Sequence, residues 1–174
     1  MADQIALRAF TANDLPFLER LNTDPDAIGP FSWSGFRDAR GRCRRWETDG
    51  FIGVDSAALA VAQADGRAIG IASWEAVNRG GPPGGCYEIG LALLPDYRGR
   101  GLGTAAQRLL VDYLFRFTLA NRLEAQTDAE NVAEQKALER IGFRQEGLLR
   151  GVRFRHGAWQ DMIIYGLLRH EFQD

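Results

Sequence analysis

Metal-ligating and redox-active side chains are scarce in this sequence of 174 residues. The two cysteines, Cys43 and Cys86, lie far apart without a CxxC spacing, and the two histidines are His156 and His170. A structural zinc site needs four such ligands, usually in closely spaced pairs. We therefore predict that the protein has no metal site.

An excess of positive charge is also missing, as is any long apolar run. The 21 basic and 23 acidic side chains give a formal net charge of -2, whereas a general nucleic-acid binder needs a basic excess to neutralise phosphates. No apolar run approaches the ~20 residues of a membrane span. The N-terminus MADQIALRAF lacks the basic start and apolar core of a secretory signal. We expect a cytoplasmic protein that binds neither nucleic acid nor a membrane.

The composition that remains is that of an ordinary globular domain, with 45% hydrophobic and 25% charged residues. The length fits one domain with a core of its own. The sequence contains no repeat, low-complexity tract or Ser/Gly-rich linker that would mark a boundary. We therefore treat residues 1–174 as one domain.

Hydrophobic periodicity and turn residues predict alternating strands and helices. Strand patterns cover residues 5–10, 57–64, 68–77, 86–94, 123–127, 143–149 and 161–168. Helical patterns cover residues 11–22, 34–46, 101–119 and 131–141, with Thr11 and Ser34 as N-caps and Gly142 as a C-cap. This order predicts an α/β (mixed α+β) fold with a mixed sheet and helices on both faces.

The segment that carries chemistry runs from Tyr87 to Arg108. A strand stops at Pro95, and the sequence Arg98-Gly99-Arg100-Gly101-Leu102-Gly103-Thr104 then opens directly into an amphipathic helix. Glycines let the backbone turn sharply and approach a ligand. The first N–H groups of a helix have no partner within the helix, and the helix dipole favours an anion there. The pattern predicts a phosphate site, with a tight turn without a ligand as the alternative.

Two common phosphate loops do not fit this segment. The Walker loop needs Lys-Ser/Thr after its last glycine, but Leu102-Gly103 follows Gly101. The dinucleotide fingerprint needs GxGxxG, whereas these glycines are spaced Gly99-x-Gly101-x-Gly103.

The loop instead resembles the signature of the GNAT-type N-acetyltransferases, Arg/Gln-x-x-Gly-x-Gly/Ala between a strand and a helix. Asn131 and the run from Ala137 to Phe143 resemble the second conserved block of the family. The residues from Glu146 to Arg150 and from Gly157 to Asp161 resemble the RimJ/RimL-like branch. The resemblance covers nearly the whole chain and implies the GNAT fold, with a central, mostly antiparallel sheet.

The resemblance also implies a co-substrate, acetyl-coenzyme A. The backbone N–H groups of Gly99, Arg100, Gly101, Leu102, Gly103 and Thr104 are expected to bind its pyrophosphate, with charge added by Arg98 and Arg100. The edge of the strand at Leu91, Ala92 and Leu93 is expected to pair with its pantetheine arm. Asn131 matches a family position that often contacts the coenzyme.

Glu88 is the candidate general base, because several family members carry a catalytic glutamate on the strand before the loop. A substrate ammonium has a pKa of about 10, so a group must remove its proton before the amine attacks. The alternative for Glu88 is a structural carboxylate that satisfies backbone or arginine groups. A backbone N–H within residues 91–93 would stabilise the charge on the thioester oxygen.

The residue that protonates the departing thiolate is not evident. Many family members use a tyrosine in the second block, but this chain has Leu138 there. Tyr165, on the last predicted strand, is a substitute, and water or the product is another source. The branch often has Ser or Ala three residues after the conserved Asn, whereas this chain has Glu134, so no role is transferred to that position.

The acceptor site is expected beside the N-terminal helices. Phe31, Trp33, Phe36 and Trp46 lie close in sequence, so these aromatic residues wall a pocket or fill the core. Trp74 and Glu75, on the predicted strand before the Gly/Pro loop, are also expected to face the acceptor site. The arginine-rich stretch from Arg37 to Arg45 guides an anionic acceptor or donor, or is a solvated helix face. Cys86 is expected to be a packing residue.

The leading hypothesis is an acetyl-coenzyme A-dependent N-acetyltransferase whose acceptor is a small-molecule amine. An α-amino group of a protein or peptide is the competing acceptor, and another acyl group stays open. The non-enzymatic alternative is an acyl-coenzyme A sensor. The family often forms dimers, so a homodimer is compatible with the resemblance.

Overall fold

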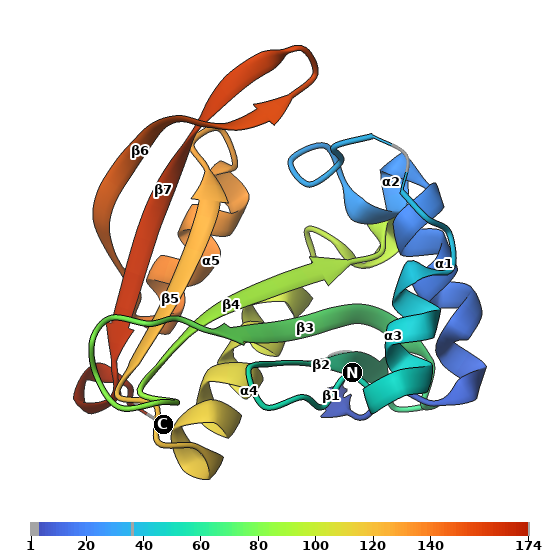
Figure 1. Cartoon of the computed structure of the whole chain (residues 1–174), viewed down its shortest axis with the longest axis horizontal. Coiled ribbons are helices and arrows are strands. Elements are labelled where there is room, and N and C mark those ends of the chain that lie inside the picture. The colour runs from blue at the N-terminus through green and yellow to red at the C-terminus, as the bar shows by residue number, and fades with distance from the viewer. Residues whose placement is uncertain (1–3, 36, 174) are drawn as a thin grey trace.

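One seven-stranded sheet organises the computed structural model, which describes residues 4–35 and 37–173 (Figure 1). Its strand order is β1-β2-β3-β4-β5-β7-β6. The strands are β1 (Ile5–Arg8), β2 (Ser56–Gln63), β3 (Ala68–Ala76), β4 (Cys86–Leu93), β5 (Arg122–Asp128), β6 (Arg144–Arg155) and β7 (Ala158–Leu168). The β4–β5 pair is parallel and every other pair is antiparallel. The predicted mixed, mostly antiparallel sheet is confirmed.

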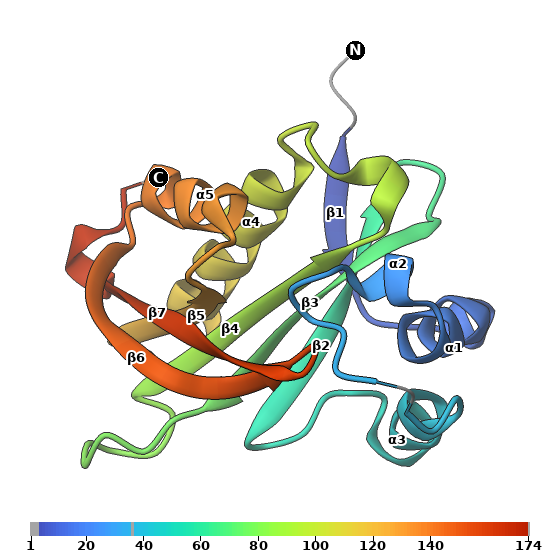
Figure 2. The ribbon, with the colours of Figure 1, turned by 90° about the horizontal axis from the view of Figure 1, so that it is seen from above.

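Helices cover both faces of this sheet, as predicted (Figure 2). The helices α4 (Leu102–Phe117) and α5 (Val132–Ile141) lie on one face, and α1 (Leu15–Thr23), α2 (Pro25–Ile28) and α3 (Gly41–Asp49) lie on the other. Because β2 is covered on both sides, all six residues from Ala57 to Ala62 are buried rather than alternating.

The buried stripe of α4 differs from a simple count of its apolar residues. Leu102, Ala106, Leu110 and Leu114 are buried at intervals of four residues. Leu109 immediately precedes Leu110, lies outside this stripe and is 39% exposed. A helix presents only one such stripe to a sheet, so apolar residues on the adjacent row stay at its margin.

The N-terminal helices begin later than the sequence pattern predicts. Thr11 caps a short 3-10 turn through Asp14, and α1 begins only at Leu15. The segment around Pro25, where the sequence pattern predicts neither helix nor strand, contains the short helix α2, because Asp24 accepts a hydrogen bond from the Asp26 N–H and proline fits the first helical turn. The predicted helix from Ser34 begins only at Gly41, and Phe36 lies outside the described residues.

The C-terminal strands are longer than predicted. The two predicted segments are the inner parts of a hairpin, β6–β7, which continues to a turn at His156 and Gly157, with φ angles of +50° and +79°. The outer part of β6 is exposed on most of its residues. The alternation of Val152, Arg153, Phe154 and Arg155 is typical of a strand, although the predicted strand ends at residue 149.

Arg155, at the end of β6, fastens this hairpin to β5 and to the segment after α2. Its Nη2 donates to Asp128 Oδ2 over 2.6 Å, and its Nη1 donates to the Pro30 carbonyl over 3.2 Å. The guanidinium lies 5.3 Å from the centroid of the Phe31 ring. The side chains of Arg155 and Asp128 are 9% and 1% exposed, so this ion pair is almost fully buried.

Loss of this ion pair is expected to destabilise the fold. Arg155→Met leaves the Asp128 carboxylate buried without its cation, which costs about 3–5 kcal/mol in comparable pairs. Urea unfolding measures the change. Arg150→Met removes an exposed arginine from the same strand and is expected to change the free energy of unfolding by less than about 0.5 kcal/mol. Equal stability of the two variants would show that the ion pair between Arg155 and Asp128 does not stabilise the fold.

Candidate functional site

Two neighbouring strands separate at the centre of the sheet. The parallel pairing of β4 with β5 joins Cys86 through Ile89 to Arg122 through Ala125 and then stops. The pairing of β4 with β3 continues to Leu93. Within the described chain, the edge of β4 from Gly90 to Leu93 that faces β5 therefore has no strand partner. Figure 1 shows the two strands diverging.

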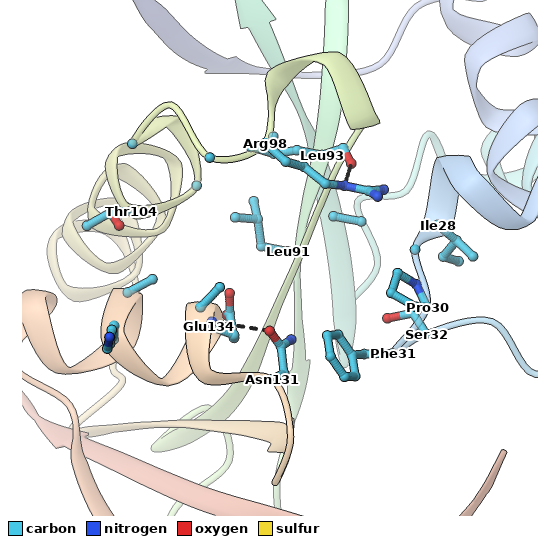
Figure 3. A pocket seen from close by; sticks show the side chains of 18 of the residues that line it. Ile28, Pro30, Phe31, Ser32, Leu91, Leu93, Arg98, Thr104, Asn131 and Glu134 are labelled. Carbon is cyan, nitrogen blue, oxygen red and sulfur yellow. Dashed lines mark hydrogen bonds between the residues drawn. The ribbon is translucent and has the colours of Figure 1, made fainter.

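A cleft of about 510 Å³ occupies this gap (Figure 3). Its walls come from β4, from the loop before α4, from the first turns of α5 and from the segment after α2. Of the residues expected at the coenzyme, nine line it: Leu91, Ala92, Leu93, Arg98, Gly99, Gly101, Gly103, Thr104 and Asn131. The fold thus gathers nearly all of that predicted set around one space.

The loop before α4 meets the geometric needs of an anion site. Gly99 and Gly101 have φ angles of +72° and +79°, which other residues rarely adopt. The turn at Gly101 starts a helix of 16 residues, whose first N–H groups have no acceptor within the helix. A side chain at Gly103 would meet Leu91 and Leu93 at 3.6 and 3.8 Å, so α4 begins close against β4.

Two residues of the expected set do not line the cleft. The side chain of Leu102 belongs to the core, where it is 6% exposed. The Arg100 guanidinium lies 6.0 Å from the centroid of the Tyr97 ring, and its Nη1 donates to the Asp96 carbonyl over 3.4 Å. Any contribution of these two residues to the cleft comes through the backbone or over a longer distance.

Arg98 has a structural task in addition to its charge. Its Nε donates to the Leu93 carbonyl over 2.8 Å, and its Nη2 donates to the Ala27 carbonyl over 2.6 Å. The side chain thus ties the end of β4 to α2 on the opposite wall (Figure 3). Burial lowers the pKa of Arg98, and the nearby Asp26 and Asp24 charges raise it.

Asn131 and Glu134 form the wall contributed by α5. Asn131 is the N-cap, and its Oδ1 accepts from the Glu134 N–H over 3.3 Å (Figure 3). The Glu134 Oε1 accepts from Gln107 Nε2 on α4, and burial raises the pKa of this carboxyl. The other polar atom of the Gln107 side chain, Oε1, is buried without a described partner. Glu134 stands out in the sequence because it lies three residues after Asn131, where the family branch often has Ser or Ala. No sequence pattern predicts that its side chain is buried.

The aromatic residues expected at the acceptor have different surroundings. Phe31 lines the cleft, opposite Asn131 (Figure 3). Trp33 follows Phe31 closely in sequence but does not line the cleft. Trp74 borders a second hollow, on the face of the sheet that carries α3, while its ring packs in the core against Tyr113 of α4, with ring centroids 5.6 Å apart. Its cross-strand partner is Ile89, one residue after Glu88, which puts the two side chains on opposite faces.

Glu88 lies on the face of the sheet that carries α3, beside a second hollow of about 210 Å³. Its Oε2 accepts from Gln126 Nε2 of β5 over 2.8 Å. Burial raises the pKa of the Glu88 carboxyl, and the Gln126 hydrogen bond opposes that shift. Gly90 lines this second hollow and the next residue, Leu91, lines the cleft, so β4 contributes to the walls of both spaces.

A neighbouring carboxylate on β5 behaves in the opposite way. Glu124 is the cross-strand partner of Glu88 and accepts hydrogen bonds from Arg79 and Arg122 at 2.7 to 3.0 Å. These two arginines lower the pKa of Glu124 to about 2. Cys86, 3.6 Å from the Glu124 carboxylate, is buried, and burial raises the pKa of its thiol to about 11. Cys86 is therefore not poised as a thiolate.

Tyr165 does not face the cleft. It is fully buried, and its hydroxyl lies 3.3 Å from Glu139 Oε1 on α5.

Within the described ranges, no three His, Cys, Asp or Glu side chains group as metal ligands. None of the helices in those ranges is both long and apolar enough to cross a bilayer.

Comparison with known proteins identifies one domain family. The sequence profile of the acetyltransferase (GNAT) domain matches residues 4–144. The uncharacterized N-acetyltransferase p20 of Bacillus licheniformis is 35% identical over 88 residues, which cover 51% of this chain and 49% of that protein. The spermidine N(1)-acetyltransferase of Escherichia coli is 29% identical over 85 residues, covering 49% of this chain and 46% of that protein. In both matches the chain spans about half the length of the relative.

Solved structures share the fold over the whole chain. The spermidine N-acetyltransferase of Vibrio cholerae, in complex with CoA and spermine, has a TM-score of 0.84 at 20% identity and covers 97% of both chains. The Mycobacterium smegmatis RimJ, in complex with CoA-disulfide, has a TM-score of 0.83 at 23% identity, covering 99% of this chain and 86% of that chain. At these identities the likeness concerns the fold.

The buried carboxyl of Glu134 generates a prediction about stability. A raised pKa in the folded state means that folding favours the neutral acid, so this contribution is present at low pH and is lost as the pH rises through the folded-state pKa. Glu134→Gln keeps an acceptor for Gln107 without the charge. We expect it to raise the melting temperature by about 2–4 °C at pH 8 and by less at pH 4.

Thermal unfolding at several pH values measures this difference. Glu47→Gln, at an exposed position on α3, is the matched control and is expected to show no such trend. A gain from Glu134→Gln that is the same at pH 4 and pH 8 would show that burial does not disfavour the Glu134 carboxylate.

Proposed function

Because the match over residues 4–144 shows that the chain belongs to the GNAT acetyltransferase family, we propose that it transfers an acetyl group from acetyl-coenzyme A to a primary amine. One observation carries the proposal: the unpaired edge of β4 leads along a single cleft to the glycine loop that opens α4. The coenzyme is an extended molecule with amides in one part and a pyrophosphate in the other. Its amides match the strand edge, and its pyrophosphate matches the glycine loop.

The cleft suits the coenzyme in two ways. The free N–H and C=O groups of β4 between Gly90 and Leu93 can pair with the pantetheine amides, as an added strand pairs with a sheet edge. The N–H groups from Gly99 to Thr104, at the positive end of the α4 dipole, can hold the pyrophosphate. Asn131 and Phe31 lie where they would contact the arm between these points.

We assign removal of the proton from the acceptor ammonium to Glu88. It lies beside the hollow that shares β4 as a wall with the cleft, and its burial raises its pKa toward the pH at which a general base is effective. Gln126 orients the carboxylate through its hydrogen bond. The thioester supplies the activated acetyl group, and a backbone N–H of residues 91–93 would stabilise the charge on its oxygen.

Glu134 is placed to hold a proton beside the cleft. It lines that space, and its burial favours the neutral carboxylic acid. It therefore replaces Tyr165 as the candidate donor to the departing thiolate. Water remains the alternative source.

For the acceptor we propose a small amine, within a RimJ/RimL-like enzyme. The hollow at Glu88 holds about 210 Å³, below the range of ~300–1,000 Å³ of pockets for drug-sized ligands. The resemblance to RimJ and to the spermidine acetyltransferases supports the branch only broadly. A protein or peptide α-amine is the competing acceptor, and a sensor that binds acyl-coenzyme A without turnover is the non-enzymatic reading.

Release of free thiol from acetyl-coenzyme A in the presence of amines tests the proposal. We expect Glu88→Gln to lower kcat by about 10²–10⁴-fold with little change in coenzyme affinity, since it removes the base but keeps the side-chain shape. In the wild-type protein, kcat/KM is expected to fall as acid protonates Glu88. Coenzyme binding without turnover of any amine or peptide would favour the sensor.

Gln126→Met separates a catalytic carboxylate from a structural one. The Gln126 hydrogen bond stabilises the charged form of Glu88, so its loss raises the pKa of that carboxyl further. The acid limb of the kcat/KM profile is then expected to move to higher pH. An unchanged limb would contradict the role of Glu88 as the base. Glu47→Gln is expected to leave both the rate and the limb unchanged.

A further inference from the structure

The arginines of α3 fall into two groups with different partners. Arg44 forms an ion pair with Asp38, and Arg40 lies 4.0 Å from carboxylate oxygens of both Glu19 and Glu47. These two side chains are 60% and 67% exposed, so they are the ordinary ion-paired surface of a helix.

Arg42 and Arg45 lie beside the hollow that contains Glu88, and their partners are neutral. The Nε of Arg42 donates to Asn22 Oδ1 over 2.9 Å, and Arg45 Nη2 donates to Ser56 Oγ over 2.6 Å. Neither guanidinium has a carboxylate within 4.0 Å among residues 4–35 and 37–173. The helix thus pairs Arg40 and Arg44 with acids and leaves the half-buried Arg42 and the exposed Arg45 without a carboxylate partner in the described ranges.

The position of the Arg42 guanidinium is electrostatically unfavourable. Burial lowers the pKa of Arg42, and the charges of Arg37 and Arg45 lower it further. A partly desolvated cation among like charges is unfavourable unless an anion completes the site. An uncompensated cation that faces a hollow therefore indicates a site for an anionic group.

The same hollow has two carboxylates on its sheet side, those of the cross-strand partners Glu75 and Glu88. The charges that act most on Glu88 belong to Glu124, Glu75 and Arg79, rather than to α3. The α3 guanidinium groups and the Glu75 and Glu88 carboxylates therefore form separate parts of one space of about 210 Å³, which Ser56, Ser73 and Gly90 also line. A ligand with one positive and one negative end would satisfy both parts.

We propose that the acceptor is a small primary amine that also bears a carboxylate, which Arg42 and Arg45 bind while its amino group reaches Glu88. The inference rests on the proposed acetyl transfer and narrows its substrate to an amino-acid-like molecule. A polyamine would bring further positive charge against two guanidinium groups, and like charges across an interface are unfavourable.

Matched pairs of acceptors test this directly. The ω-amino acids from glycine to 6-aminohexanoate are compared with n-alkylamines of the same chain length, with spermidine and phosphoethanolamine as further acceptors. We expect kcat/KM for at least one amino acid to exceed that for its alkylamine by about tenfold or more, the effect of one charge-assisted hydrogen bond. A larger preference for phosphoethanolamine would show that the site binds phosphate instead of carboxylate and would overturn the carboxylate assignment.

Arg42→Met locates the effect. We expect it to raise KM for the preferred amino acid about tenfold or more, with kcat largely kept and alkylamine kinetics unchanged. Arg45→Met is the second variant, in case loss of the Asn22 contact impairs folding, which the unfolding midpoint monitors. Arg44→Met, on the outer side of α3, is expected to leave the kinetics unchanged.

The outcomes separate this inference from the proposed function. Preference for spermidine or alkylamines, or an equal effect of Arg42→Met on all acceptors, would overturn the carboxylate site while acetyl transfer stands. Turnover of peptides alone would overturn the small acceptor. If the coenzyme binds but no amine of any class reacts, acetyl transfer itself fails and the acceptor site fails with it.

Discussion

The separation of β4 from β5 after Ile89 and Ala125 is the constraint on which the rest of this structure depends. Two arginines brace the gap from opposite sides. Arg98 holds the end of β4 to α2, and Arg155 holds the end of β5, through Asp128, to the Pro30 carbonyl. Both side chains thus connect a diverging strand to the segment that forms the far wall. The cleft is therefore a braced feature of the fold, which supplies an unpaired strand edge at a fixed place.

Two neighbouring carboxylates, Glu88 and Glu124, differ in whether arginines neutralise their charge, and this difference gives them different chemical properties. Glu88 and Glu124 are cross-strand partners, yet burial raises the pKa of Glu88 while two arginines lower that of Glu124 to about 2. Environments that push two such pKa values apart commonly mark acid–base chemistry. Arg42 is the corresponding case for a cation. Its guanidinium is partly buried, and its hydrogen-bond partner is the neutral amide oxygen of Asn22 rather than a carboxylate. The groups left uncompensated by the fold are those that face the two hollows.

Local signals in the sequence predicted much of the fold and of the coenzyme cleft. The glycine loop, the cap at Asn131 and the strand through Leu91 are contiguous patterns, and the structure brings all three to one space. The hydrogen bonds of Gln126 to Glu88 and of Arg155 to Asp128 join residues 38 and 27 positions apart, and no local pattern encodes them. Trp74 shows the same limit, because the register of β3 on β4 turns its ring into the core.

The central claim is that the unpaired edge of β4 and the loop before α4 bind one extended ligand. Hydrogen–deuterium exchange with and without coenzyme A tests it most directly. The account predicts slower exchange for the amides of residues 90–93 and 99–104 together, because the ligand would pair with the first set and place its phosphates on the second. Amides of the outer β6–β7 hairpin are expected to be unaffected. Coenzyme binding that leaves both β4 and the loop unprotected would contradict the account.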